Sequence, residues 1–239
     1  MQDIVLKIGG SLLSPSAEKM FDFSYALQLR DLLAQFSTDY RFWIAVGGGY
    51  LNRYYQKLAS EHGEDGTIDL HKIGVSATNL NAEIFHGLLD DLCQLEVLRY
   101  QQYEEFMQKG APALPPELGR VVVTGGSRPG QSNDWNALQL ALRLGSSQVI
   151  DVKNVDGVYS ADPRSNPNAE FIPSLSWDEY LDIIGNPTEH APGAHYPVDP
   201  VAAREAKAEQ IKYIIVGSDL ANLREVVWGG EFHGTTIAG

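Results

Sequence analysis

The chain alternates short apolar runs with stretches that carry apolar residues at helical spacing. Continuous apolar runs that end in glycine or polar turns are typical of buried strands, whereas apolar residues three and four positions apart are typical of covering helices. The runs predict strands over 4–8, 42–46, 120–123, 148–152 and 213–216. The helical spacing predicts helices over 23–36, 51–58, 73–89, 136–144, 202–208 and 220–227. The alternation predicts an α/β protein, a three-layer αβα sandwich with a mainly parallel central sheet.

Two irregular segments interrupt this pattern. The first, 110–118, is rich in proline and alanine. It predicts two lobes that share one continuous sheet, an N-terminal lobe of residues 1–118 and a C-terminal lobe of residues 119–239. The second, 186–200, holds four prolines and two histidines. We expect it to be a long functional loop, since compact domains rarely keep such a stretch otherwise.

Composition narrows the classes of partner. The 239 residues are 44% hydrophobic and carry a formal net charge of -13, which argues against bulk binding to nucleic acid or to an anionic membrane. A few local donors can still hold a small anion. The one cysteine, Cys93, excludes an intrachain disulfide and fits a small core residue in a reducing compartment. With no signal-peptide pattern and no apolar run of about 20 residues, we expect a cytoplasmic protein.

Three glycine turns follow predicted strands, at Gly9-Gly10, at Gly47-Gly48-Gly49 and at Gly125-Gly126. In a parallel sheet, ligands bind outside the carboxyl ends of the strands, and glycine lets backbone amides approach a phosphate closely. The chain has neither the P-loop motif nor the G-x-G-x-x-G dinucleotide motif. The turns therefore predict a phosphate site of another kind.

Lys7 lies inside the first predicted strand, between apolar neighbours and just before the first glycine turn. One interpretation is an ordinary surface lysine at the end of a strand. The other is a lysine that points into the glycine turn and neutralises charge on a phosphoryl group during its transfer.

Motifs along nearly the whole chain resemble the amino acid kinase family, and within it the uridylate kinases of archaeal type. The motifs are K-I-G-G-S at 7–11, G-G-G-x-x-x-R at 47–53, I-G-x-x-A-T-x-x-N at 73–81, T-G-G with a later P-G and D within 124–134, N-V-D-G-V-Y-x-x-D-P at 154–163, D-P-x-A-A at 199–203, and G-E-x-x-G-T at 230–235. The N-V-D-G-V-Y-x-x-D-P run, together with the ordered glycine turns, is the specific part of this resemblance.

The resemblance implies a kinase that uses ATP and Mg²⁺ to phosphorylate a small-molecule phosphate acceptor, a nucleoside monophosphate and most simply UMP. Its catalytic candidates are Lys7, Asp134 and Asp199, and Asp199 would also organise Mg²⁺. The ATP-binding candidates are Gly9, Gly10, Ser11, Lys153, Asn154, Asp156, Tyr159 and Asp162. The acceptor-binding candidates are Gly47, Gly48, Gly49, Arg53, His71, Gly74, Thr78, Ser132 and Asn133. No general base is needed, because a phosphate acceptor is already anionic. Relatives of this kind suggest a homo-oligomer, a hexamer or a dimer.

Several positions depart from the family pattern. His71 stands where the family has an aspartate that contacts the UMP ribose, unless a shifted helix start gives that place to Asp69. Ser132-Asn133 replace two threonines, Trp135 and Asn136 replace small residues, and Lys153 replaces a threonine. Two alternatives therefore stay open: a kinase for another small phosphate or carboxylate, such as isopentenyl phosphate, acetylglutamate or aspartate, or a non-catalytic nucleotide-binding or storage protein.

Overall fold

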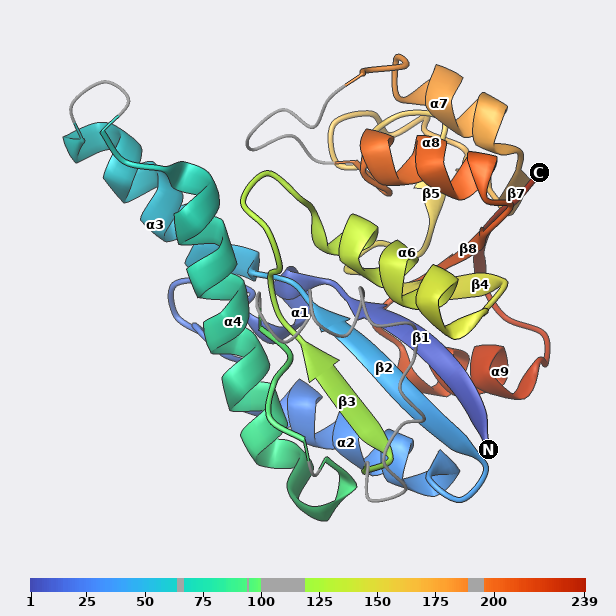
Figure 1. Ribbon diagram of the computed structural model, residues 1–239. Helices are drawn as coiled ribbons and strands as arrows, with labels where there is room; N and C mark the ends of the chain where they lie inside the picture. Colours follow the sequence, from blue (N-terminus) through green and yellow to red (C-terminus); the bar gives the residue numbers. More distant parts are fainter. Residues whose placement is uncertain (64–66, 94, 100–118, 189–195) are drawn as a thin grey trace.

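A computed structural model describes residues 1–63, 67–93, 95–99, 119–188 and 196–239. Its centre is a seven-stranded sheet in the order β3-β2-β1-β4-β8-β9-β7 (Figure 1). The strands are β1 (Gln2–Ile8), β2 (Tyr40–Val46), β3 (Val121–Thr124), β4 (Gln148–Val152), β7 (Ser174–Leu175), β8 (Lys212–Val216) and β9 (Gly234–Ile237). All neighbouring pairs are parallel except β8 and β9. A small antiparallel hairpin joins β5 (Val158–Tyr159) and β6 (Phe171–Ile172).

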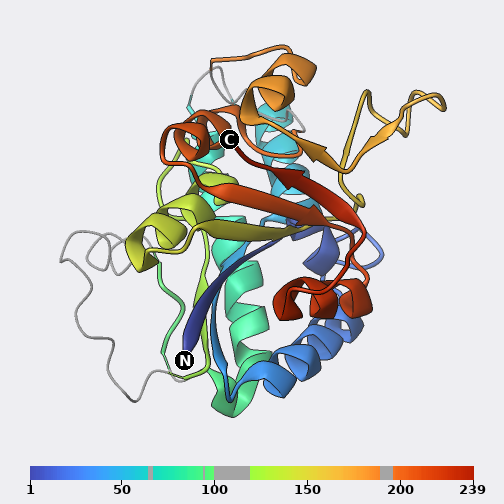
Figure 2. The ribbon, with the colours of Figure 1, turned by 90° about the vertical axis from the view of Figure 1, so that its right-hand side faces the viewer.

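Helices cover both faces of the sheet, which confirms the predicted three-layer αβα sandwich. One face carries α2 (Phe23–Phe36), α4 (Leu70–Leu89) and α9 (Leu220–Trp228), and Figure 2 shows α2 and α9 side by side. The other face carries α6 (Asn133–Leu144), α7 (Trp177–Ile183) and α8 (Pro200–Ala208). The other helices in the described part of the chain are α1 (Gly10–Leu13), α3 (Gly49–His62) and the short η1 (Asp90–Leu92).

Strand alternation decides which side chains meet which helices. Successive residues of a strand point to opposite faces. Leu6 and Ile8 pack into the apolar cluster under α2, α4 and α9, whereas Val5 packs into the cluster under α6, α7 and α8. Lys7 has the same parity as Val5 and lies on the α6 side. On β4, Asp151 shares the face of Val149 and so lies on that side too.

The strand order creates a crevice between β1 and β4. From β1 the chain moves to β2 and β3 on one side, and then returns to place β4 on the other side of β1. The loops that follow β1 and β4 therefore leave the sheet in different directions, and such a switch point is where open α/β sheets bind ligands. Lys7 and the turn at Gly9 stand at this crevice.

Among the described residues, the sequence predicted every long strand and helix but misjudged several ends. α4 begins at Leu70 rather than at 73, because the Asp69 side chain caps it by accepting from the backbone N–H of His71 at 3.0 Å and of Lys72 at 3.3 Å. α7, the β5–β6 hairpin, β7 and β9 were missed, because segments of two to seven residues carry too little periodicity. None of the described helices is long and apolar enough to cross a bilayer.

The predicted join at 110–118 lies outside the described residues, as does 189–195 of the predicted loop. β3 follows the join but pairs with β2, so one sheet carries strands from both predicted lobes. The division into an acceptor-binding lobe, 1–118, and an ATP-binding lobe, 119–239, remains a proposal.

We predict that Cys93 is chemically inert in the folded protein. The side chain is buried in the core, and this burial raises the pKa of its thiol to about 11, against the opposing effect of backbone hydrogen bonds. Because the thiolate is the reactive form, an aromatic disulfide reagent at pH 8 should label native protein at least about 100-fold more slowly than the unfolded chain. Similar rates before and after denaturation would contradict a buried thiol.

Candidate active site

The turns after β1 and β2 pack directly against one another. A Cβ added to Gly10 would lie 2.6 Å from the carbonyl carbon of Gly47 and 2.7 Å from the backbone nitrogen of Gly48. Gly49 has φ of +60°, a conformation that favours glycine. The N–H of Gly47 donates to the carbonyl of Ile8 at 3.0 Å. The two glycine turns thus form a single unit, in which side chains larger than hydrogen do not fit.

A buried asparagine from α4 fixes the second turn. The Asn81 amide donates to the carbonyls of both Gly47 and Gly48 at 3.0 Å. The buried Thr78 lies one turn earlier on α4, where its hydroxyl would lie 3.0 Å from a Cβ placed on Gly48. The motif at 73–81 therefore presents its polar side chains to the glycine turn.

The third predicted turn, Gly125-Gly126, serves a different purpose. A Cβ on Gly125 would lie 3.0 Å from the Cα of Asn79, and one on Gly126 would lie 3.0 Å from the Cα of Val75. These glycines let α4 approach the end of β3 closely. The pair is explained by packing.

Four buried or nearly buried charges meet at the crevice between β1 and β4. Lys7 Nζ lies 2.9 Å from Asp134 Oδ1 and 3.2 Å from Asp151 Oδ1. Lys153 Nζ lies 3.1 Å from Asp151 Oδ2 and 3.7 Å from Asp134 Oδ1. Each lysine contacts both aspartates, so the side chains form a closed ring. We call Lys7, Asp134, Asp151 and Lys153 the charge ring.

Burial and paired charge together set the pKa values of the ring. Burial disfavours the Lys7 ammonium, but Asp134 and Asp151 outweigh it and raise the pKa of Lys7 well above its usual range. Burial also disfavours the Asp134 carboxylate, but Lys153 and Lys7 outweigh it and hold the pKa of Asp134 far below its usual range. For the other two residues burial prevails, raising the pKa of Asp151 and lowering that of Lys153. Lys7 and Asp134 are therefore the firmly ionised pair.

Asp199 joins the ring from the start of α8. Its backbone N–H donates to Asp134 Oδ2 at 3.1 Å, and its Oδ1 caps α8 by accepting from the N–H groups of Val201 and Ala202 at 2.9 Å. Magnesium in nucleotide sites is held by one or two carboxylates plus substrate phosphates. Asp199 could supply one such carboxylate. The described residues contain no group of three or more candidate metal ligands.

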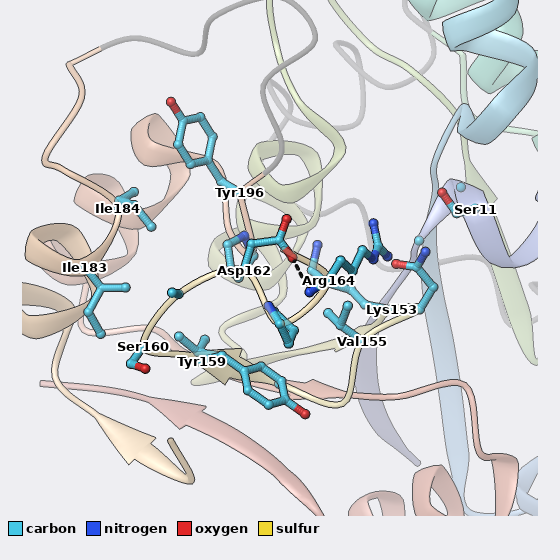
Figure 3. A pocket seen from close by; sticks show the side chains of 18 of the residues that line it. Ser11, Lys153, Val155, Tyr159, Ser160, Asp162, Arg164, Ile183, Ile184 and Tyr196 are labelled. Atoms are coloured by element: carbon cyan, nitrogen blue, oxygen red, sulfur yellow. Dashed lines mark hydrogen bonds between the residues drawn. The ribbon is translucent and has the colours of Figure 1, made fainter. Parts of the chain in front are cut away.

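A cavity of about 570 Å³ opens beside the ring (Figure 3). Its lining includes Lys7, Gly9, Gly10, Ser11, Arg53, Lys153, Asn154, Tyr159, Asp162, Arg164, Ile183, Ile184 and Tyr196. In Figure 3, Ser11 and Lys153 lie at one side, whereas Ile183, Ile184 and Tyr196 lie at the other. A volume of this size suits a small organic ligand. A polar, glycine-lined end and an apolar end suit the phosphates and the base of a nucleotide.

The N-V-D-G-V-Y segment forms one wall of this cavity and is braced from β9. Thr235 accepts from the N–H of Val158 at 2.8 Å and donates to the carbonyl of Ile172 at 2.6 Å. Tyr159 packs edge-on against Phe171, with ring centroids 5.5 Å apart. Asp156 lies beside Gly217 and is not among the residues that line the cavity, although its chain neighbours Val155 and Gly157 are. The predicted nucleotide-binding role of Asp156 thus stays a prediction.

Arg53 lies between the two glycine turns. It lines the cavity with the predicted ATP-binding residues, and its Nη1 donates to the Ser11 hydroxyl at 3.3 Å. Partial burial lowers the pKa of Arg53, and the nearby charge of Arg164 adds to this effect. The predicted contact of Arg53 with an acceptor phosphate stays a prediction.

The remaining acceptor candidates lie on α4 and α6. His71 is exposed on the first turn of α4, and Gly74 faces α3, where a Cβ would lie 3.4 Å from Asn52 Oδ1. Ser132 caps α6 by accepting from the N–H of Trp135 at 3.1 Å, and Asn133 accepts from the Asn136 amide at 3.2 Å. Their predicted contacts with an acceptor likewise stay predictions.

Sequence reasoning missed Asp151 and Arg164. A signal for Asp151 was present, because an aspartate inside an apolar strand needs a buried partner. Arg164 follows the D-P of the nucleotide motif and lines the cavity, but nothing in its own spacing separates it from a surface arginine.

This combination of fold and site defines a family. Paired glycine turns and a lysine at a strand end stand at the switch point of an αβα sandwich. The model of the amino acid kinase family matches residues 3–217, and the chain therefore belongs to that family. The resemblance predicted from the motifs is confirmed.

Among its relatives of similar length are uridylate kinases. The chain is 34% identical over 235 residues to the uridylate kinase of Pyrococcus abyssi, and this match covers 98% of each chain. It is 33% identical over 236 residues to the uridylate kinase of Archaeoglobus fulgidus, and this match covers 98% of this chain and 99% of the relative. The crystal structure of Archaeoglobus fulgidus uridylate kinase matches with a TM-score of 0.77 over 100% of both chains, at 31% identity.

We predict that Lys7→Ala lowers turnover by about 10²–10³, as expected when a group that neutralises developing charge is removed. The variant should also unfold more easily, since Asp134 and Asp151 would then share one cation. Steady-state ADP release, measured on protein shown to be folded by circular dichroism, checks this. Lys57→Ala, which removes an exposed α3 lysine, is the control. Near-normal turnover in folded Lys7→Ala would remove Lys7 from the reaction.

Proposed function

We propose that this protein transfers the γ-phosphoryl group of ATP to UMP, yielding UDP and ADP. The observation that carries the proposal is Lys7, paired with Asp134 at 2.9 Å beside the glycine turn at Gly9-Gly10 in a cavity of nucleotide size. The full-length match to uridylate kinases supports UMP as the acceptor.

The residues act by positioning and by neutralising charge. Backbone N–H groups of Gly10 and Ser11 hold the ATP phosphates, while Gly9, whose own N–H donates to the Val152 carbonyl at 2.8 Å, allows the phosphates to approach the backbone closely. The Lys7 ammonium balances charge on the group in transfer. Mg²⁺, when bound beside Asp199, supplies further positive charge to the phosphates. No side chain needs to remove a proton, because the UMP phosphate is already ionised.

The acceptor occupies the side of the second glycine turn. Gly48, Gly49 and Arg53 hold the UMP phosphate, and α4 contributes Thr78 and Gly74 nearby. Arginine suits this contact because its guanidinium can bind phosphate through two parallel hydrogen bonds. The position of Arg53 between the two turns brings the acceptor phosphate next to the donor.

The two alternatives find less support. Kinases for isopentenyl phosphate, acetylglutamate or aspartate share the fold, but the matched relatives are uridylate kinases over their full length. The buried pairing of Lys7 with Asp134 counts against a storage protein, because burying both charges carries a desolvation cost and a site without catalysis has no reason to keep them.

The proposal extends to the setting of the enzyme. We expect a cytoplasmic enzyme of pyrimidine metabolism that works on small molecules. We also expect a dimer or a hexamer, since Tyr54, Tyr55 and Leu58 expose apolar surface on α3.

A coupled ADP-release assay over a panel of acceptors tests the proposed function. The panel holds UMP, CMP, AMP, isopentenyl phosphate, acetylglutamate and aspartate, each with ATP and Mg²⁺. We expect UMP to give the highest kcat/KM. A higher value for another acceptor would replace UMP, and ATP binding without ADP release for any acceptor would favour the storage alternative.

We predict that His71→Asp tightens UMP binding. A carboxylate accepts hydrogen bonds from both ribose hydroxyls, whereas a neutral imidazole offers one acceptor, and a charge-assisted bond contributes about 1.5–3 kcal/mol. UMP affinity and turnover are the measurements. Asp69→Asn is the control, because asparagine still caps α4 but lacks the charge. If Asp69→Asn weakens UMP while His71→Asp changes nothing, Asp69 holds the ribose instead.

A further inference from the structure

The charge ring contains an aspartate that no bound ligand can reach. Asp151 is 0% exposed, is the next-to-last residue of β4, and pairs across the sheet with Lys7. Its Oδ1 lies 3.2 Å from Lys7 Nζ and its Oδ2 lies 3.1 Å from Lys153 Nζ. One carboxylate therefore serves two lysines, one oxygen for each.

Both lysines line the polar end of the cavity. Lys7 and Lys153 come from the ends of β1 and β4, and their side chains are only 9% and 12% exposed. Two ammonium groups so close in a dry site repel each other, and each also loses hydration. Asp134 alone would leave one excess positive charge among three groups. Asp151 brings the ring to two positive and two negative charges.

We propose that Asp151 is a positioning residue that holds the ammonium groups of Lys7 and Lys153 side by side at the phosphate end of the cavity, so that two lysines, rather than Lys7 alone, bind the ATP phosphates. This inference rests on the proposed use of ATP. It assigns Asp151 no contact with substrate. Its effect passes through the position and charge of the two lysines.

Asp151 and Asp134 are the carboxylates that pair with Lys153, and the phenols packed around the ring carry no charge. Tyr213 from β8 donates its hydroxyl to the Asp134 carbonyl at 2.7 Å, and Tyr180 from α7 donates to the Val198 carbonyl. Burial raises the pKa of both phenols, so both are neutral. Asp199 reaches the ring through its backbone N–H to Asp134, and Lys7 adds repulsion.

Asp151→Asn tests this role, since it keeps the shape and removes one charge. We expect KM for ATP to rise about tenfold while KM for UMP stays unchanged. Loss of the anion makes Lys153 easier to deprotonate, and its cation is lost as pH rises. The alkaline limb of kcat/KM for ATP should therefore move to lower pH. A folded Asp151→Asn protein with wild-type ATP KM and pH profile would overturn the proposal.

Lys153→Met provides an independent test that does not depend on the folding of Asp151→Asn. Lys153→Met should raise KM for ATP by a similar factor. In the double variant with Asp151→Asn, the alkaline limb of kcat/KM for ATP should move no further than in Lys153→Met alone. Unchanged ATP affinity in Lys153→Met would refute the proposal that Lys153 binds the ATP phosphates beside Lys7. Asp39→Asn, the same change at an exposed site before β2, should leave all these values at wild type.

Calorimetric titration with a non-hydrolysable ATP analogue separates this inference from the proposed function. If wild type fails to phosphorylate UMP but Asp151→Asn still binds the analogue about tenfold more weakly, the proposed acceptor is wrong and the role of Asp151 stands. If wild type phosphorylates UMP and both variants bind the analogue normally, the function stands and the role of Asp151 is refuted.

Discussion

The ion pairing between Lys7 and its two aspartates is the constraint on which the site depends. A buried charge is tolerated only when it is paired, and removing one partner typically destabilises a protein by about 3–5 kcal/mol. Lys7 comes from β1, Asp151 from β4 and Asp134 from α6, so the pairing fixes two adjacent strands and the helix above them. Asp199 extends this connection to α8 through its N–H. The register of the sheet and the placement of the reactive lysine therefore depend on the same contacts.

The two glycine turns are locked together beside this lysine. Gly10 and Gly47 approach so closely that a methyl group on Gly10 would overlap the neighbouring backbone, and Asn81 holds the second turn from below. Phosphoryl transfer between two phosphates needs little chemistry from the protein beyond proximity, alignment and charge neutralisation. In the proposed reaction the interlocked turns would supply proximity, and Lys7, held in place by its two aspartates, would supply a fixed positive charge without reorganisation.

The sequence was sufficient for the layers and for Lys7, but it was not sufficient for the ring. Apolar runs and helical spacing located the long elements, and the position of Lys7 between apolar neighbours, just before the first glycine turn, marked it as a candidate. Asp151 has the same parity as Val149, so the sequence was enough to predict that its side chain is buried. It was not enough to predict that Lys7 is its partner. That partner depends on β4 lying beside β1, a choice of strand order that local periodicity does not carry. The start of α4 was misplaced for a related reason, because the cap at Asp69 lies before the apolar periodicity begins.

Two departures from the family pattern support the start of α6. Trp135 donates to Glu205 on α8 at 2.7 Å, and the buried Asn136 bonds the Ser127 hydroxyl and Asn133. They hold the first turn of α6, which carries Asp134, against α8 and the preceding loop. Lys153 is a third departure close to this part of the site. A lysine there adds a nearly buried charge, which needs the nearby Asp134 and Asp151 as partners. In the proposed reaction these departures would bear on the donor phosphates and their charge balance. His71, exposed on the first turn of α4, is the departure that would bear on the choice of acceptor.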